Sequence, residues 1–476
     1  MNRQEIKETL YKKINTWKNM SRENNSDWEK ANDYYDNEIM ELIIEEFLAK
    51  DENKFEEDYD YLIVTVGQSY QPIVLSILAL QPKNVLFLVT RTTKKELDKI
   101  FNFIDLKFSQ CYTKMVDKAS PIDVYQKIKE LYDDLVEPIK LAVDFTGGTK
   151  SMSTGAAMAG SLIGADVFYI TSKYLRQFRA AEPGTERLAK IENPYEVFGD
   201  LDEKKAFGLW NEHNYQAAAK KFNELLNKVR DDRKYKVLNL WADAYANWEK
   251  FNLIKAIKKL EEGLYEAKRY SIYTEKIPRL SKQLSILKIL QEVTDKRGLE
   301  KLDNIEHVKS LIFSIYSSAV RKEDNNRYDI ASLLLYRILE MIAQRRLASH
   351  DIDVSAPALS KSKKMELLDK MNEIIAPVKP LNKMEIFPEK ISCIKGYILL
   401  SALDDPISEV IDWGWMMSTI NTRNQSILAH GFEFISKENY HRFKELVLKL
   451  LNKFCKIEEI QMKEMIERFK FIKLRF

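Results

Sequence analysis

The chain has 476 residues, of which 45% are hydrophobic and 31% charged, a balance typical of a folded protein and not of a disordered or membrane-embedded one. Its length exceeds the size at which one hydrophobic core stops growing, so we expect two or three domains. The 75 basic and 72 acidic residues leave a net charge of only +3. An anionic partner must therefore be held by a local patch and not by global attraction.

The cysteines and the N-terminus indicate the compartment. Cys111, Cys393 and Cys455 lie far apart, without the spacing of a zinc site or of a disulfide framework. The N-terminus has no continuous apolar segment like that of a signal peptide, and no run of about 18 apolar residues occurs in the chain. We therefore expect a cytoplasmic protein with no bound metal and no membrane insertion.

The first 182 residues change character at residue 59. Residues 1–58 are charged and helical in pattern, and we expect them to form a leader outside any core. From Tyr61 onward, continuous apolar runs alternate with segments of helical periodicity, which is typical of parallel strands covered by helices on both faces. We expect a Rossmann-like α/β domain over residues 59–182, with strands at YLIVTV, NVLFLV, KLAVDF and DVFYIT.

The remainder of the chain is helical in pattern, and strand signals stop after Pro183. Two segments, 206–226 and 244–264, match at corresponding positions: Trp210 with Trp248, and Asn214 with Asn252. This similarity predicts two stacked helical hairpins within a spacer over residues 183–299. Residues 300–476 form a last helical block. The expected fold class is thus α/β plus all-α.

The stretch VDFTGGTKSM, residues 143–152, is the first candidate site, because it joins a buried strand to a helix. Ligands of parallel sheets bind at the carboxyl ends of strands, where the next helix directs its N-terminal amides outward. Paired glycines let the backbone approach a ligand, and a lysine suits phosphate. The glycines required for a nucleotide-triphosphatase loop or a dinucleotide fingerprint are absent.

Two further strand ends supply polar side chains, and together the three ends predict a pocket for a nucleotide-like ligand. The alternative is that the glycines only close a tight turn and that the lysine is solvated. The candidate ligand-binding residues are Gly67, Gln68, Ser69, Thr90, Arg91, Thr146, Gly147, Gly148, Thr149, Lys150, Ser151 and Met152.

The stretch NTRNQSILAHGFEF contains the second candidate site, Arg423 and His430. Seven residues return to nearly the same helical face, about 10 Å along the axis, and Gly431 is a natural helix stop. A histidine can move a proton to or from a ribose 2′-hydroxyl while an arginine stabilises the charge on the phosphate, so the pair could cleave RNA without a metal. Arg345 and His350 are the rival pair, about 140° apart on a regular helix.

These two stretches resemble a known family. DFTGGTKSM is similar to the ligand motif of CARF domains, the Rossmann-like sensors of type III CRISPR systems. RYDIASLLLYRILEMIAQ and RNQSILAHG resemble parts of a HEPN ribonuclease domain. The order of the two is that of the CRISPR-associated Csm/Csx ribonucleases, and the resemblance covers most of the chain.

The resemblance implies an antiviral endoribonuclease that cyclic oligoadenylates activate. It implies a homodimer that binds one cyclic ligand across its two-fold axis and cleaves single-stranded RNA, without a metal or other cofactor, at a composite site. Carried over by position, the nuclease motif falls on Arg423, Asn424 and His430. The form of the glycine motif favours cyclic tetra-adenylate, with cyclic hexa-adenylate possible, and hydroxyls of Ser69, Thr146 and Thr149 could cut the activator slowly.

Two other function classes stay open at this stage. One is a sensor without catalysis, a ligand-controlled regulator or adaptor whose helical half binds a partner. The other, a nucleotide-dependent phosphotransferase, is disfavoured because the phosphate-loop pattern is missing.

Overall fold

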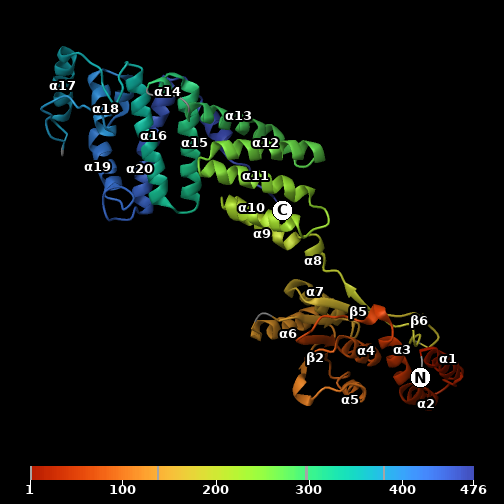
Figure 1. Cartoon of the computed structure of the whole chain (residues 1–476). Helices are drawn as coiled ribbons and strands as arrows, with labels where there is room; N and C mark the ends of the chain where they lie inside the picture. Colours follow the sequence, from red (N-terminus) through yellow and green to blue (C-terminus); the bar gives the residue numbers. More distant parts are fainter. Residues whose placement is uncertain (1–2, 137–138, 179, 295–298, 379–380, 476) are drawn as a thin grey trace. The chain divides into compact units, whose positions relative to one another are not determined.

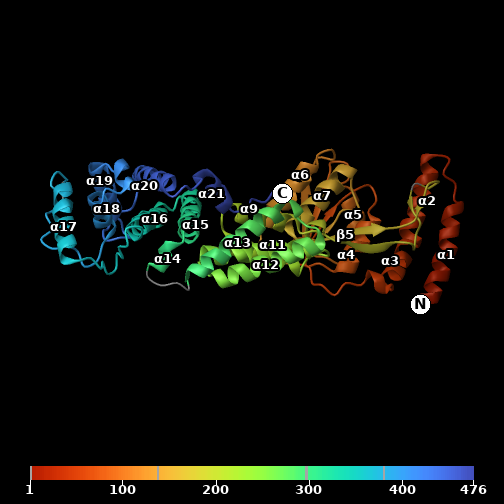
Figure 2. The same ribbon diagram turned by 90° about the horizontal axis from the view of Figure 1, so that it is seen from above.

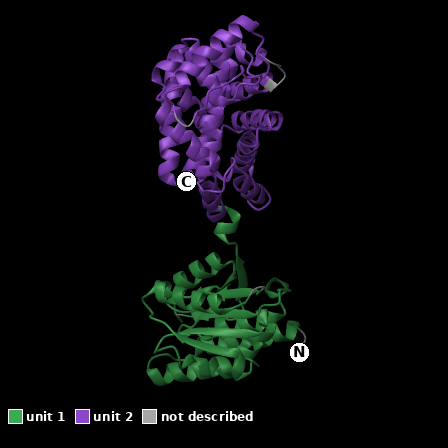
Figure 3. Ribbon diagram, turned by 90° about the vertical axis from the view of Figure 1, so that its left-hand side faces the viewer, with its two compact units in different colours: residues 1–199 green, residues 200–476 purple. Residues whose placement is uncertain are grey.

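The computed structural model describes residues 3–136, 139–178, 180–294, 299–378 and 381–475. The chain divides into two compact units, Met1–Gly199 and Asp200–Phe476, which are coloured separately in Figure 3. The first unit is an α/β domain and the second is helical, so the expected fold class is confirmed. None of the helices within the described residues is both long and apolar enough to cross a membrane.

A six-stranded sheet forms the centre of the first unit, in the order β3-β2-β1-β4-β5-β8. The first five strands of this order are parallel, and β8 runs antiparallel to β5. The apolar runs expected to be strands are β1, β2, β4 and β5. The strands are β1 (Tyr61–Thr65), β2 (Asn84–Val89), β3 (Cys111–Met115), β4 (Leu141–Asp144), β5 (Asp166–Thr171) and β8 (Arg187–Ile191), and a separate hairpin pairs β6 (Tyr174–Leu175) with β7 (Ala180–Ala181).

The sheet contains two strands that the apolar pattern does not reveal, β3 and β8. Both are edge strands, and four of the five residues of β3 are exposed. Edge strands carry polar side chains and lack a continuous apolar run. The expectation that strand signals end at Pro183 is therefore wrong, because β8 lies beyond it and pairs with β5.

Helices cover both faces of this sheet (Figure 3). One core cluster joins the sheet to α6 and α7 through Val124, Ile128, Ala156 and other side chains. The opposite cluster joins it to α4 and to the first three helices. The helices of the unit are α1 (Arg3–Asn19), α2 (Asn25–Glu38), α3 (Met40–Leu48), α4 (Gln71–Leu80), α5 (Glu96–Phe101), α6 (Pro121–Asp134), α7 (Lys150–Ile163) and α8 (Pro194–Val197).

The expectation that residues 1–58 lie outside the core is wrong. Figure 2 shows α1 and α2 side by side, and their side chains Leu10, Trp17 and Tyr35 are buried in the same cluster as the sheet residues Leu62 and Phe168. A charged helix can have this role because only a narrow stripe of its side chains needs to be apolar. Residues 1–58 are therefore part of the first unit.

The two matching segments form the two expected hairpins at the start of the second unit. Trp210 and Trp248 are buried at the ends of α9 and α11, and Asn214 and Asn252 cap α10 and α12 by accepting from Ala217 N and Lys255 N at 3.3 and 3.4 Å. In Figure 1 these helices and α13 run roughly parallel to one another. Their bounds are α9 (Asp200–Asn211), α10 (Tyr215–Leu226), α11 (Arg233–Glu249), α12 (Leu253–Tyr270) and α13 (Ile277–Thr294).

The last helical block is built around the long helices α15, α16 and α20, which stand side by side in Figure 1. After α21 the chain returns to the hairpins, where Phe471 stacks on Tyr245 with ring centroids 3.8 Å apart. The bounds are α14 (Glu300–Asp303), α15 (Ile305–Asp324), α16 (Tyr328–Ala348), α17 (Lys361–Ile375), α18 (Cys393–Ala402), η4 (Pro406–Val410), α19 (Trp413–Asn424), α20 (Lys437–Ile457) and α21 (Met462–Phe469).

Candidate ligand site and candidate active site

The carboxyl ends of β1 and β4 meet at the centre of the sheet. The two strands are parallel neighbours, with Val64 opposite Asp144, and the chain leaves β1 toward β2 on one side and reaches β4 on the other. This is the switch point at which open α/β sheets bind ligands. The glycine stretch therefore lies where the sequence predicts a ligand site.

The glycines at this junction have no room for side chains. A Cβ atom on Gly147 would lie 2.1 Å from the carbonyl oxygen of Thr65, and one on Gly67 would lie 2.6 Å from the amide of Gly148. Gly148 also has a φ of +82°, which favours glycine. The loops after β1 and β4 thus touch through their backbones.

Asp144, the last residue of β4, holds the glycine loop through the hydrogen bonds of its buried carboxyl. It is 1% exposed and accepts hydrogen bonds from the Ser76 hydroxyl and from both the amide and the hydroxyl of Thr146. Burial raises the pKa of this carboxyl, although the three hydrogen bonds act in the opposite direction. The Thr146 hydroxyl in turn accepts from Ile170 N at 2.7 Å, so it is already engaged within the protein.

The candidate ligand-binding residues at the start of α7 differ in exposure. Lys150 is exposed, and Ser151 is half-buried. The hydroxyl of Thr149 caps the helix by accepting from Met152 N at 3.3 Å, and it also donates to the carbonyl of Lys118. Met152 is fully buried and packs beneath Gly148. It supports the loop and does not present its side chain to a ligand.

The candidate residues at the end of β2, Thr90 and Arg91, do not line a cavity at the predicted ligand site. Thr90 is buried, and its hydroxyl lies within hydrogen-bonding distance of those of Thr92 and Thr93, at 3.0 and 3.1 Å. Arg91 is exposed. Neither Thr90 nor Arg91 is among the residues that line the two cavities described next. Gln68 and Ser69, at the end of β1, are exposed and line one of them.

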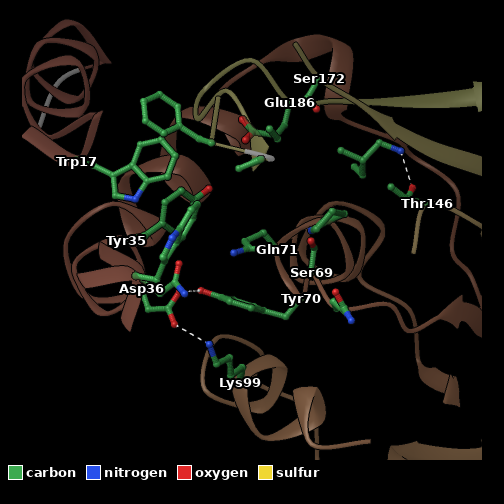
Figure 4. Close-up of a pocket in the computed structure, with 18 of the residues that line it drawn as sticks. Trp17, Tyr35, Asp36, Ser69, Tyr70, Gln71, Lys99, Thr146, Ser172 and Glu186 are labelled. Atoms are coloured by element: carbon green, nitrogen blue, oxygen red, sulfur yellow. Dashed lines mark hydrogen bonds and ion pairs between the residues drawn. The ribbon is translucent and has the colours of Figure 1, made fainter. Parts of the chain in front are cut away.

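Two cavities, each of about 620 Å³, flank the glycine loop. The loop cavity is lined by Gly148, Lys150, Ser153 and neighbouring residues. The aromatic cavity lies between the strand ends, the helices α1 and α2 and the β6–β7 hairpin, and Figure 4 shows its side chains. Thr146 and Tyr169 line both cavities. The helices α1 and α2, which the sequence does not connect with the site, thus form one wall of the aromatic cavity.

The second candidate site has a different backbone from the one expected. The helix α19 ends at Asn424, so Arg423 and His430 do not share a helical face. The chain turns back after Gln425, and the amide of His430 donates to the carbonyl of Asn424 at 3.1 Å. Gly431 is not a helix stop. It is required because a Cβ there would lie 1.9 Å from the Gln425 carbonyl oxygen.

The side chains of this loop differ sharply in exposure. Arg423 is 8% exposed, its guanidinium lies 4.1 Å from the centre of the Tyr336 ring, and its Nη1 donates to Asn424 Oδ1 at 3.1 Å. Burial lowers the pKa of Arg423. His430 is exposed. The loop therefore brings the backbones of Asn424 and His430 together, with the imidazole of His430 exposed and the guanidinium of Arg423 held against Tyr336.

The rival pair, Arg345 and His350, forms ion pairs and hydrogen bonds within the helical unit. Arg345 forms an ion pair with Glu458 at 3.1 Å, and His350 Nε2 lies 2.9 Å from Asp405 Oδ2. Arg346, which no sequence motif marks, binds both of these carboxylates. This buried network ties α16 to η4 and α20, so His350 has a packing role in this unit.

Among the described residues, no group of three or more His, Cys, Asp and Glu side chains is placed to hold a metal ion.

Two solved structures that resemble this chain have TM-scores below 0.5. Csm6 from Enterococcus italicus, bound to cyclic hexa-2′-fluoro-hexa-dAMP, has a TM-score of 0.44 and 11% identity, covering 86% of this chain and 98% of that one. Can2 from Sulfobacillus thermosulfidooxidans, in complex with cyclic tetra-adenylate, has a TM-score of 0.22 and 15% identity, covering 42% and 68%.

The sequence comparisons are more direct. The CRISPR system endoribonuclease Csm6 of Thermus thermophilus is 22% identical over 401 residues, which are 80% of this chain and 82% of the relative. Residues 198–292 match the family model of the Csm6 6H domain, and residues 301–454 match that of the Csm6 HEPN domain. Since both matches are to consecutive domains of one protein family, the chain belongs to the Csm6 family of CARF-HEPN ribonucleases of CRISPR systems.

Proposed function

We propose that this protein is an endoribonuclease of type III CRISPR defence, that a cyclic oligoadenylate activates it, and that it cleaves single-stranded RNA without a metal. The observation that carries the proposal is the loop after α19, in which an exposed imidazole follows a held arginine within the Csm6 HEPN match. An RNA strand can reach His430 from solvent, as a ribonuclease active site requires.

His430 moves protons in the proposed reaction. Its imidazole takes the proton of the ribose 2′-hydroxyl as that oxygen attacks the adjacent phosphorus, or gives a proton to the departing 5′-oxygen. The products are a 2′,3′-cyclic phosphate and a 5′-hydroxyl. Arg423 stabilises the charge on the phosphate, and Asn424 orients Arg423 through its hydrogen bond to Nη1.

The active site is proposed to be composite, built from two copies of the chain. Around His430 the loop exposes large apolar side chains at fractions that a monomer rarely sustains in one place: Ile427 at 49%, Leu428 at 45%, Phe432 at 93% and Phe434 at 78%. A second copy that covers this surface would bring the two loops together, in a closed two-fold dimer.

The cyclic oligoadenylate is proposed to bind at the ends of β1 and β4, with its phosphates near Lys150 and the N-terminal amides of α7. Ring size is left to the test, with cyclic tetra-adenylate favoured over cyclic hexa-adenylate. Slow cutting of the activator would fall to Ser69, because the hydroxyls of Thr146 and Thr149 already donate to Asp144 and Lys118. Binding shifts the protein toward the state in which the two HEPN loops align.

The test is an RNA cleavage assay with purified protein, EDTA and each cyclic oligoadenylate in turn. We expect cleavage by the wild type only when a cyclic ligand is present, and loss of at least about a hundredfold in rate for His430→Ala. His350→Ala is the matched control. Its cleavage rate per folded molecule should equal that of the wild type.

Three outcomes contradict this proposal. Cleavage that survives His430→Ala but is lost in folded His350→Ala would assign catalysis to the rival pair. Inhibition by EDTA would remove the metal-free mechanism. Tight binding of a cyclic ligand without cleavage of any RNA would favour the alternative, a ligand-controlled regulator or adaptor.

A further inference from the structure

The aromatic cavity has walls suited to a flat ring. It encloses about 620 Å³, and six aromatic side chains line it: Trp17, Trp28, Tyr35, Tyr70, Tyr169 and Phe178. Four of the six come from α1, α2 or the β6–β7 hairpin, outside the alternating strands and helices of the domain. Aromatic faces bind nucleobases by stacking, whatever the sequence of the ligand.

The charges of this cavity are unfavourable for a phosphate. Lys99 is the only cation among the described residues that line it, and its Nζ lies 3.0 Å from Asp36 Oδ2. The second oxygen of Asp36 accepts from the Tyr70 hydroxyl at 2.5 Å. With this cation paired and a further carboxyl in the wall, none of the described residues that line the cavity offers an unpaired positive charge. The guanidinium of Arg22, which is not in the lining, lies 4.7, 5.5 and 4.6 Å from the ring centres of Trp17, Trp28 and Phe178.

Glu186 and Trp17 leave hydrogen-bonding groups unused. Glu186 is 4% exposed and its Oε2 is buried without a partner among the described residues, as is the indole nitrogen of Trp17. Burial raises the pKa of Glu186. Buried polar atoms without partners are rare in folded proteins and call for an explanation. Figure 4 shows Glu186 on the cavity wall, above Tyr35 and Gln71.

The aromatic cavity adjoins the loop cavity, because Thr146 and Tyr169 belong to the walls of both. A nucleotide whose phosphate lies near Lys150 is thus next to an acidic, aromatic space. We propose that an adenine base of the cyclic oligoadenylate inserts into the aromatic cavity, stacks on Trp28 and donates its exocyclic amine to Glu186. This inference rests on the proposed ligand site, and it gives α1 and α2 a role in selecting the base.

The test uses the full chain and a cyclic oligoadenylate in which one adenine is replaced by 8-vinyladenine, which keeps the exocyclic 6-amine and whose fluorescence is quenched by stacking. We expect quenching on binding to the wild type. Trp28→Ala should bind the unmodified ring about tenfold or more weakly and lose the quenching, since one base-aromatic stack is removed. Glu186→Gln keeps the shape of the side chain and should weaken binding about tenfold.

Matched variants come from the same helices. Tyr11→Ala removes an aromatic side chain that is 67% exposed on α1, and Glu29→Gln neutralises an exposed carboxylate on α2. Neither residue lines the aromatic cavity, and both variants should bind as the wild type does. Lys150→Ala should weaken binding of the cyclic oligoadenylate because it removes the contact to the phosphates, whether or not the base enters the aromatic cavity.

Two results are decisive. If Trp28→Ala and Glu186→Gln bind and quench like the wild type while Lys150→Ala loses binding, the base pocket is overturned and the proposed ligand site stands. If the wild type binds no cyclic oligoadenylate, the proposed activator falls and this inference falls with it.

Discussion

Asp144 shows how one buried carboxyl organises the ligand loop. Its oxygens accept three hydrogen bonds, one from Ser76 on α4 and two from Thr146. Desolvation of the charged form raises its pKa, and the hydrogen bonds offset this only in part. The folded protein therefore binds this proton more tightly than the unfolded chain does. The resulting stabilisation is present at low pH and is lost as the pH rises through the folded pKa.

The substitution Asp144→Asn should remove this pH dependence. The amide oxygen can accept from Thr146, and the amide nitrogen can donate to Ser76, so the loop is kept without a titrating group. We expect the free energy of unfolding of the first unit to fall less steeply with pH, above the ordinary aspartate pKa of about 4, than it does in the wild type. Denaturant titrations at a series of pH values measure the slope. Asp33→Asn, at an exposed position of α2, is the control, and an unchanged slope in Asp144→Asn would contradict this account.

At the scale of elements, the second unit is tied by ionic contacts between helices distant in sequence. Arg346 on α16 binds Asp405 Oδ2 at 2.8 Å, just before η4, and Glu458 Oε1 at 2.9 Å, just after α20. Burial acts to raise the pKa of Asp405, but the hydrogen bonds from Arg346, Ile407 N and His350 outweigh it and lower the pKa overall. Stabilisation from this carboxylate is therefore present near neutral pH and is lost as the pH falls through the folded pKa.

Arg346→Ala should destabilise the second unit by about 3–5 kcal/mol, because it leaves two buried carboxylates without their shared cation. Lys363→Ala is the control. It breaks an exposed pair with Glu366, in which both side chains are nearly half exposed, and it should change stability by less than about 1 kcal/mol. Chemical denaturation followed by circular dichroism measures both. Equal effects of the two substitutions would show that the network is not a stabilising tie.

At the scale of the whole molecule, the end of the chain completes the core of the second unit. Trp210 Nε1 donates to the carbonyl of Ile472 at 2.8 Å, and the side chain of Asn211 bonds both the amide and the carbonyl of Leu474. Phe471 lies between the Tyr245 ring and the guanidinium of Arg321, whose carbon is 3.9 Å from the ring centre. Residues 471–474 are therefore part of the packed core of the hairpins.

Phe471→Ala should lower the free energy of unfolding of the second unit by about 3–5 kcal/mol, the usual cost of emptying a buried phenylalanine site. The transition of the first unit should not move, because Phe471 packs within the second. Lys473→Ala, an exposed position of the same segment, should have little effect. Differential scanning calorimetry separates the two transitions. A shift of the first-unit transition instead would contradict this assignment.

Much of the architecture could be predicted because its signals are local. The continuous apolar runs at β1, β2, β4 and β5 indicate strands buried on both faces, and the matched Trp and Asn positions indicate the two hairpins. The edge strands β3 and β8 gave no such signal, since an edge does not need an apolar run. The sequence does not reveal that the three N-terminal helices join the core, because a narrow apolar stripe is hard to distinguish in a charged segment.

The candidate sites also combine features that local sequence reveals with features that depend on folding. The sequence by itself determined that glycines and a lysine follow β4, and that an arginine, an asparagine and a histidine lie within eight residues of one another. Only the tertiary structure decided which side chains are free: Tyr336 holds Arg423, Asp405 holds His350, and Ser76 and Ile170 engage the residues beside the glycines. Periodicity and backbone sterics act over a few residues, whereas exposure and hydrogen bonding depend on partners that folding brings from far along the chain.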